Sequence, residues 1–75
     1  MDQKRIGRRI KAFRKLKGYT QVEFAKELEI PLSVLGRMER GSKPVSEDLL
    51  DKIIAALDIS KEELILYDKN DGESD

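Results

Sequence analysis

Apolar residues recur along this chain at helical spacing and fall into five groups. The first group predicts a helix from about Asp2 or Gln3 to Lys17. Gly18 then supplies the backbone conformation that commonly ends a helix. The apolar face of this helix, with steps of four, three and three residues, is Ile6, Ile10, Phe13 and Leu16. No group alternates as a strand would, so the pattern predicts an all-α chain.

The next two groups predict a pair of short helices with a tight break between them. Thr20, followed three residues later by Glu23, has the form of a capping box, in which each side chain bonds the other residue's amide. The helix that begins there runs to about Leu28. Pro31 prevents its continuation because proline has no amide donor. A third helix covers about residues 31–40.

The last two groups predict two more helices. Ser46 caps a fourth helix, and Ser60 repeats the capping-box pattern before a last helix through about Tyr67. The apolar stripe of the fourth helix is Leu49, Leu50, Ile53, Ile54 and Leu57. We therefore expect a compact bundle of four to five short helices over residues 1–67. Residues 68–75 are polar and acidic, and we expect a disordered tail there.

Composition excludes several kinds of site. The 75 residues include no cysteine and no histidine, which argues against disulfides and zinc, and no glycine-rich phosphate loop is present. Most carboxylates lie at predicted helix caps or in the tail, so we expect no enzyme activity, no cofactor and no small-molecule ligand. No apolar run approaches the roughly 18 residues of a membrane span. We expect a soluble, cytoplasmic protein.

Charge is segregated along the chain although the formal net charge is zero. Residues 1–43 carry 12 Lys and Arg against 5 Asp and Glu, whereas residues 44–75 carry 3 against 10. A basic half attracts nucleic acid, and an acidic half would orient that basic half toward it. A simple balance of charge for solubility remains an alternative interpretation. Most basic residues of the first helix are expected to be solvated.

The helix pair resembles a known DNA-binding motif. Two short helices joined by a tight turn can place the second helix in the major groove, but many small bundles contain such a pair. The longer pattern is Tyr19-Thr20-Gln21, Phe24-Ala25, Leu28, Ile30-Pro31, Leu35, Arg37-Met38-Glu39-Arg40-Gly41, Ser46 and the stripe from Leu50 to Leu57. Over about Ile6 to Ile65 this resembles the lambda-repressor-like, or XRE, helix-turn-helix family. Two departures are Glu29, at a turn position where the family usually has glycine, and Leu32, where glutamine is common. The first implies a slightly strained turn.

The resemblance implies a sequence-specific regulator, of repressor type, that binds double-stranded DNA with the helix at about residues 31–40. The implied base-reading residues are Leu32, Ser33, Val34, Gly36 and Arg37. The implied contacts to the DNA backbone are Thr20, Gln21, Arg40, Ser42 and Lys43. An ion pair between Arg14 and Glu39 is implied between the first and third helices. Two alternatives to these roles stay open. Leu32 is partly buried against the second helix in one, and in the other Gln21 is only a polar residue of the first helical turn.

A homodimer on a near-palindromic operator is expected, because one module of this size contacts few base pairs. The C-terminal segment has more apolar residues than one face of a short helix can bury, so a dimer surface of Leu64, Leu66 and Tyr67 is predicted. A monomer in which Leu66 and Tyr67 fold back on the fourth helix is the alternative. A protein-interaction module of the same fold is the alternative function.

Overall fold

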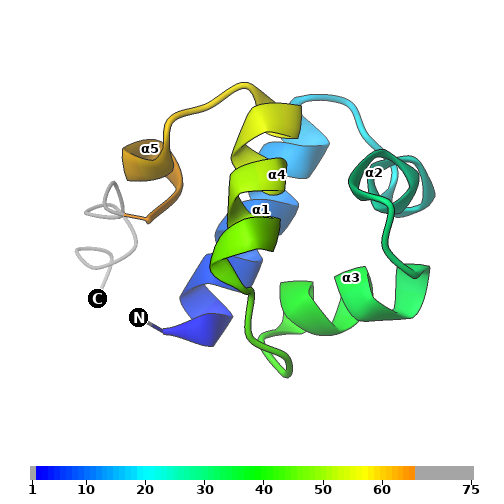
Figure 1. The fold of residues 1–75 in the computed structure, drawn as a ribbon, viewed down its shortest axis with the longest axis horizontal. Coiled ribbons are helices and arrows are strands. Elements are labelled where there is room, and N and C mark those ends of the chain that lie inside the picture. The colour runs from blue at the N-terminus through cyan, green and yellow to red at the C-terminus, as the bar shows by residue number, and fades with distance from the viewer. Residues whose placement is uncertain (1, 66–75) are drawn as a thin grey trace.

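The computed structural model describes residues 2–65, which form five helices and no strand. The helices are α1 (Gln3–Leu16), α2 (Gln21–Leu28), α3 (Leu32–Arg40), α4 (Glu47–Leu57) and α5 (Lys61–Ile65). In Figure 1, α1 and α4 run through the middle of the molecule with α5 on one side and α2 on the other, and α3 extends from beside their lower ends to a place beneath α2. The predicted all-α bundle is confirmed. None of the helices in residues 2–65 is long and apolar enough to cross a membrane.

Side-chain caps mark the starts of α2, α4 and α5, as the sequence predicts, whereas α3 begins after Pro31 without a side-chain cap. The Thr20 hydroxyl accepts the amide of Glu23 at 3.0 Å, and the Glu23 carboxylate accepts the amide of Thr20 at 2.9 Å. Ser60 and Glu63 make the same reciprocal pair. Ser46 accepts one amide from the first turn of α4. These bonds satisfy amides that a helix N-terminus otherwise leaves without a partner.

The buried face of α1 differs from the predicted one. Leu16 is 75% exposed, so its assignment to the apolar face was wrong. The face that packs inward also includes Gly7 and Arg14, which apolar periodicity does not mark. Leu16 follows Gly7 by nine residues, and at about 100° per residue the two point to opposite sides of the helix. The core that these helices enclose consists of Ile6, Ile10, Phe24, Ala25, Leu28, Leu35, Met38, Leu50, Ile53, Leu57 and Leu64.

Two glycines let α1 lie directly against the C-terminal end of α3. A Cβ atom on Gly7 would lie 2.3 Å from the backbone oxygen of Met38. Gly41, which ends α3 with a φ of 81°, is also in close contact with α1, because a Cβ there would lie 2.6 Å from the Cα of Lys4. The Gln3 amide also donates to the Gly41 carbonyl at 3.2 Å. Backbone therefore contacts backbone at this crossing.

The turn between α2 and α3 is strained in the way that the sequence implies. Glu29 has a φ of 60° and a ψ of 42°, the left-handed conformation that glycine adopts most easily. Asp58, which ends α4, has a φ of 58°. Left-handed backbone costs less for aspartate, whose short side chain can bond locally, than for most other residues. The larger strain thus lies at Glu29, directly before the third helix.

Arg9 holds α5 against α1. Its Nε atom donates to the carbonyl of Leu64 at 2.8 Å, and Nη2 donates to the carbonyl of Glu63 at 2.7 Å. The guanidinium also lies 5.9 Å from the ring centre of Phe13. Arg9 is therefore an exception to the solvation expected for most basic residues of the first helix.

Leu64 is fully buried in the core of its own chain. It cannot contribute to a dimer surface, and its assignment to one was wrong. The other two residues of that surface, Leu66 and Tyr67, lie outside the described residues, as does the predicted tail.

Candidate nucleic-acid interface

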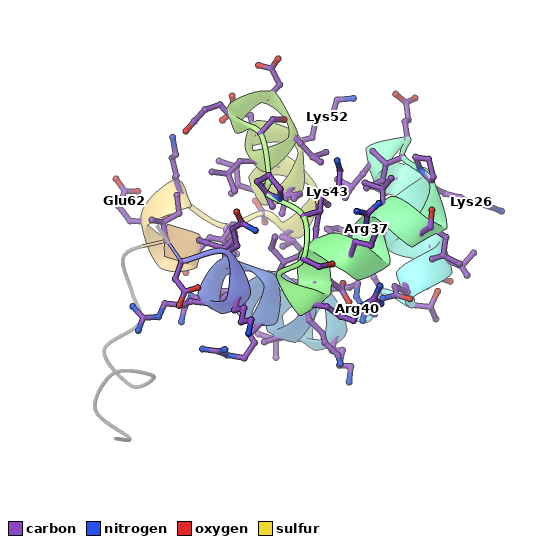
Figure 2. All side chains as sticks on the ribbon, turned by 90° about the horizontal axis from the view of Figure 1, so that it is seen from below. Lys26, Arg37, Arg40, Lys43, Lys52 and Glu62 are labelled. Carbon is purple, nitrogen blue, oxygen red and sulfur yellow. The ribbon has the colours of Figure 1, made fainter. Side chains whose placement is uncertain are left out.

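Three exposed side chains follow one face of α3. Ser33, Arg37 and Arg40 are spaced by four and three residues, which places them on the same side of the helix. Leu35 and Met38, on the other side, are fully buried. Figure 2, viewed from the α3 side of the molecule, shows Arg37 and Arg40 on this helix. The helix therefore presents a hydroxyl and two guanidinium groups outward.

The other predicted base-reading positions have different environments. Leu32, at the first residue of α3, is 44% exposed, and Val34 is partly buried against the core. Gly36 is buried: a Cβ there would lie 3.2 Å from Nη1 of Arg40 and 3.9 Å from Nε2 of Gln21. Gly36 thus lies beneath those two side chains and leaves space for them, and its assignment to the base-reading set stays a prediction.

A buried carboxylate connects the first three helices. Nε of Arg14 donates to Glu39 at 2.6 Å and Nη2 donates at 3.2 Å, a two-pronged ion pair between side chains that are 7% and 2% exposed. The Gln21 amide, at the start of α2, donates to the same carboxylate at 3.0 Å. Nη1 of Arg14 donates to the carbonyl of Tyr19 at 2.9 Å. The ion pair that the resemblance implies is present, and it also restrains Gln21.

The residues predicted to contact the DNA backbone lie at the start of α2 and just after α3. Thr20 is exposed, and because its oxygen accepts an amide in the cap, its hydroxyl hydrogen is still available to a phosphate. The Ser42 hydroxyl donates to the carbonyl of Arg37 at 3.2 Å, so it must rotate before it can donate elsewhere. Lys43 is partly buried in the loop that follows. Ser42 and Lys43 therefore follow the row at the C-terminal end of α3, whereas Gln21 lies beside the middle of the helix, close to Gly36.

Arg40 was assigned to the DNA backbone from the resemblance, but it shares the outer face of α3 with Arg37. The interval of three residues between them would have shown this from the sequence. The sequence did not predict three features: the close helix crossing at Gly7, the hydrogen bonds of Arg9 to α5, and the contact of Lys4 with Gly41. Those features depend on which helices meet, and apolar periodicity does not contain that information.

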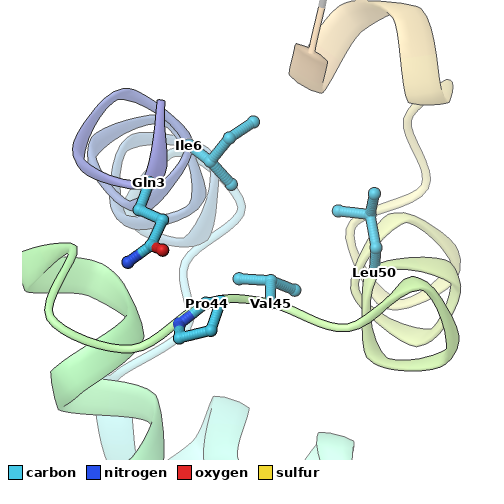
Figure 3. Close-up of a pocket in the computed structure, with 5 residues that line it drawn as sticks. All are labelled: Gln3, Ile6, Pro44, Val45 and Leu50. Carbon is cyan, nitrogen blue, oxygen red and sulfur yellow. The ribbon is translucent and has the colours of Figure 1, made fainter. Parts of the chain in front are cut away.

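A small notch lies beside the loop that follows α3. Its volume is about 180 Å³, and it is lined by Gln3, Ile6, Pro44, Val45 and Leu50 (Figure 3). No charged side chain lines it. The Gln3 amide, its one side-chain polar group, donates to the Gly41 carbonyl. The notch therefore adds no phosphate contact to the neighbouring surface, although it helps to seat the loop on the core.

A helix-turn-helix family model matches residues 10–64, which include α2, α3 and α4 completely. The chain belongs to this helix-turn-helix family. The predicted resemblance to the lambda-repressor-like, or XRE, class is confirmed.

Several proteins that are similar to this chain are named as regulators. The chain is 53% identical over 58 residues to the uncharacterized HTH-type transcriptional regulator YazB of Bacillus subtilis, and the match covers 77% of this chain and 84% of YazB. The restriction-modification controller protein C.AhdI from Aeromonas hydrophila has a similar structure, with a TM-score of 0.80 and 34% identity over 85% of this chain and 97% of that one. The biofilm master regulator SinR, solved in complex with DNA, matches with a TM-score of 0.72 and 40% identity over 80% of this chain and 97% of the solved chain. This chain spans 63% of the full length of Bacillus subtilis SinR.

Proposed function

We propose that this chain is a sequence-specific regulator of transcription, of repressor type, that places α3 in the major groove of double-stranded DNA. The observation that carries the proposal is the single exposed row of Ser33, Arg37 and Arg40 on α3. The opposite side of that helix is fixed by the core and by the Glu39 ion pair, so the row has a defined orientation. SinR, a relative with the same fold, has been solved with DNA.

Within the row, Arg37 is the main base-reading residue. A guanidinium can donate two parallel hydrogen bonds to O6 and N7 of guanine, which no other base pair offers. Ser33 can donate or accept, and the exposed side chain of Leu32 suits a thymine methyl group. Val34, partly buried, contacts the groove only with its outer atoms.

Contacts to the sugar-phosphate backbone position the helix. Thr20 and Gln21 supply polar groups at the N-terminus of α2, where the helix dipole also favours phosphate. Arg40, Ser42 and Lys43 supply the contacts after the base-reading residues. Nε2 of Gln21 carries two N–H donors and one of them bonds Glu39, so the other can donate to a phosphate while that bond is kept.

We also propose that two copies bind a near-palindromic operator in the cytoplasm. A single α3 contacts only a few base pairs, and a second copy supplies the selectivity that a genome requires. With Leu64 enclosed in the core, the apolar pair Leu66 and Tyr67 remains as the proposed dimer surface.

Selection of bound sequences from random duplexes, repeated with two variants, tests the base-reading assignment. Arg37→Ala should remove a guanine preference at one position and cost about 1–3 kcal/mol on the specific site. Lys43→Ala is the matched control, since it removes a cation that reads no base and should weaken all sequences almost equally. An unchanged motif with Arg37→Ala would show that α3 does not read DNA through this residue.

The alternative function, a module that binds protein instead of DNA, is distinguished by salt. Phosphate contacts release counterions, so the DNA affinity should fall steeply and linearly on a log-log plot against salt concentration. Lys43→Ala should reduce that slope by about one. Affinity for DNA that is weak and insensitive to salt would favour the protein-binding alternative.

A further inference from the structure

A row of cations that α3 does not use follows the outer face of α1. Lys4, Arg8, Lys11 and Lys15 are spaced by four, three and four residues, and all four are exposed. Their spacing places them on one side of the helix. No Asp or Glu occurs in residues 3–22, a stretch with eight Lys and Arg. The row is therefore a basic surface without acidic neighbours on its own helix.

A complementary row of acidic residues follows the outer face of α4. Asp48, Asp51 and Asp58 are exposed. Residues 44–65 contain six Asp and Glu in total against two lysines, Lys52 and Lys61.

Each of those lysines already has an acidic partner. Lys61 is 3.1 Å from Glu47, and Lys52 is 3.9 Å from Glu29. The pKa of Lys61 is raised, mainly by its hydrogen bond to Glu47 and by the charge of that group, with smaller contributions from Asp51 and Glu62. The surface around α4 is therefore acidic despite its two lysines.

The two rows point away from each other across the core. Ile6 and Ile10 of α1 pack in the same cluster as Leu50 and Ile53 of α4, so the outer faces of these helices are on opposite sides of the molecule. Figure 2 shows α1 and α4 on opposite sides of the view, and in Figure 1 both run upward from the α3 end. At about 1.5 Å per residue, the basic row is about 16 Å long and the acidic row about 15 Å. The rows are thus opposite in charge, similar in length and the same in direction.

We propose that the basic row on α1 of one copy docks on the acidic row of α4 of a second copy, in a head-to-tail contact. Because the two surfaces differ, each contact leaves one basic and one acidic row exposed, and further copies can add. The exposed row of α3 takes no part in it. The contact is therefore separate from the proposed base-reading surface and from the proposed C-terminal dimer.

DNA is the competing partner for the basic row, and the geometry favours a second copy. The α1 helix rises away from α3 (Figure 1), so a duplex seated on α3 meets only the Lys4 end of the row. A second duplex would have to bind the rest. In contrast, every molecule carries one acidic row for its one basic row, and the two rows are similar in length.

Charge reversal on each face tests the contact in the full chain. One variant carries Lys11→Glu with Lys15→Glu, and the other carries Asp48→Lys with Asp51→Lys. Sedimentation velocity in low salt, about 20 mM, should show association of the wild type that is lost at about 300 mM. Each variant alone should associate at least about tenfold more weakly, because one of its two rows has lost the charge that attracts the other. An equimolar mixture of the two variants should form a complex again.

The control variant carries Lys17→Glu with Lys26→Glu, which makes the same change in net charge as the Lys11/Lys15 variant but at exposed positions outside the row. It should associate as the wild type does, and circular dichroism checks that all three variants fold. A mixture that fails to form a complex, or a Lys11/Lys15 variant that associates normally, would overturn the proposal. A second DNA-binding activity would also overturn it. If the wild type captures a second labelled duplex and the Lys11/Lys15 variant does not, the basic row binds nucleic acid. A symmetric C-terminal dimer would persist in every variant and not depend on mixing.

Discussion

Glu39 brings a negative charge into the interior, and two neighbouring side chains make that burial tolerable. Arg14 supplies the compensating charge, and Gln21 supplies a further hydrogen bond to the same carboxylate. A buried ion that loses its partner keeps the desolvation penalty without the attraction that offsets it. Stability therefore depends on the pair as a unit.

We predict that Arg14→Met lowers the free energy of unfolding by about 3–5 kcal/mol. Glu39→Gln should also destabilise the fold, because it leaves the Arg14 guanidinium buried without a counter-charge. The double variant should lose clearly less than the sum of the two single losses, as measured by urea denaturation. Additivity within about 0.5 kcal/mol would show that the two groups do not stabilise each other.

The left-handed backbone of Glu29 leads to a gain of stability on substitution. Glu29→Gly should raise the free energy of unfolding by about 1 kcal/mol, because relief of the backbone strain exceeds the entropy that glycine adds to the unfolded chain. Asp58→Gly is the matched control, with a φ of 58° at the end of α4. Its gain should be smaller, since aspartate tolerates this conformation better. Thermal denaturation of both variants measures the two gains in stability. A gain for Asp58→Gly that equals or exceeds that of Glu29→Gly would contradict the assignment of the larger strain to Glu29.

The crossing of α1 over α3 depends on the lack of a side chain at Gly7. Gly7→Ala should destabilise the protein by about 1–3 kcal/mol, the usual cost of overpacking, because rigid backbone atoms of Met38 and Glu39 occupy the space. Gly36→Ala is the control within α3, where the nearest atom belongs to the movable end of Arg40. It should fold with nearly unchanged stability in chemical denaturation. Equal losses of stability in the two variants would mean that the helix crossing does not restrict the size of the side chain at position 7.

The helix starts could be predicted from sequence because caps are local. Thr20, Glu23 and Ser46 act within one turn of their own helix, and the structure contains each of their bonds. The inward place of Gly7 and the docking bonds of Arg9 could not be predicted in the same way. They arise where one helix meets another 30 to 55 residues away in the chain, and nothing in the local pattern records that meeting.

The features of the candidate site also differ in whether the sequence could predict them. The ion pair of Arg14 and Glu39 could be anticipated from a family pattern that spans both helices. The burial of Gly36 under Arg40 and Gln21 could not, because it depends on how two long side chains settle over the helix.

At the scale of the whole molecule, the proposed C-terminal dimer leads to a prediction about assembly. Leu66→Glu with Tyr67→Ser should shift the chain from dimer to monomer in sedimentation equilibrium, because it places a charge in an apolar contact. Leu16→Glu is the control, since Leu16 is 75% exposed at the C-terminal end of α1, outside the proposed dimer surface, and its loss should leave the dimer intact. If wild type and double variant sediment alike and bind a two-half-site operator with equal cooperativity, the C-terminal interface does not exist.

The outward row of α3 has a consequence for how this protein can evolve. Ser33 and Arg37 make no contact that the core requires, while Leu35, Met38 and Glu39 keep the helix in place from behind. Exposed positions of this kind usually accept exchange within about 0.5 kcal/mol of stability. Under the proposed base-reading assignment, substitutions at those two positions can therefore change the preferred operator without a penalty in folding. Arg40 is less free, because any replacement must still cover the bare backbone at Gly36, so a new specificity is most accessible through the first two residues of the row.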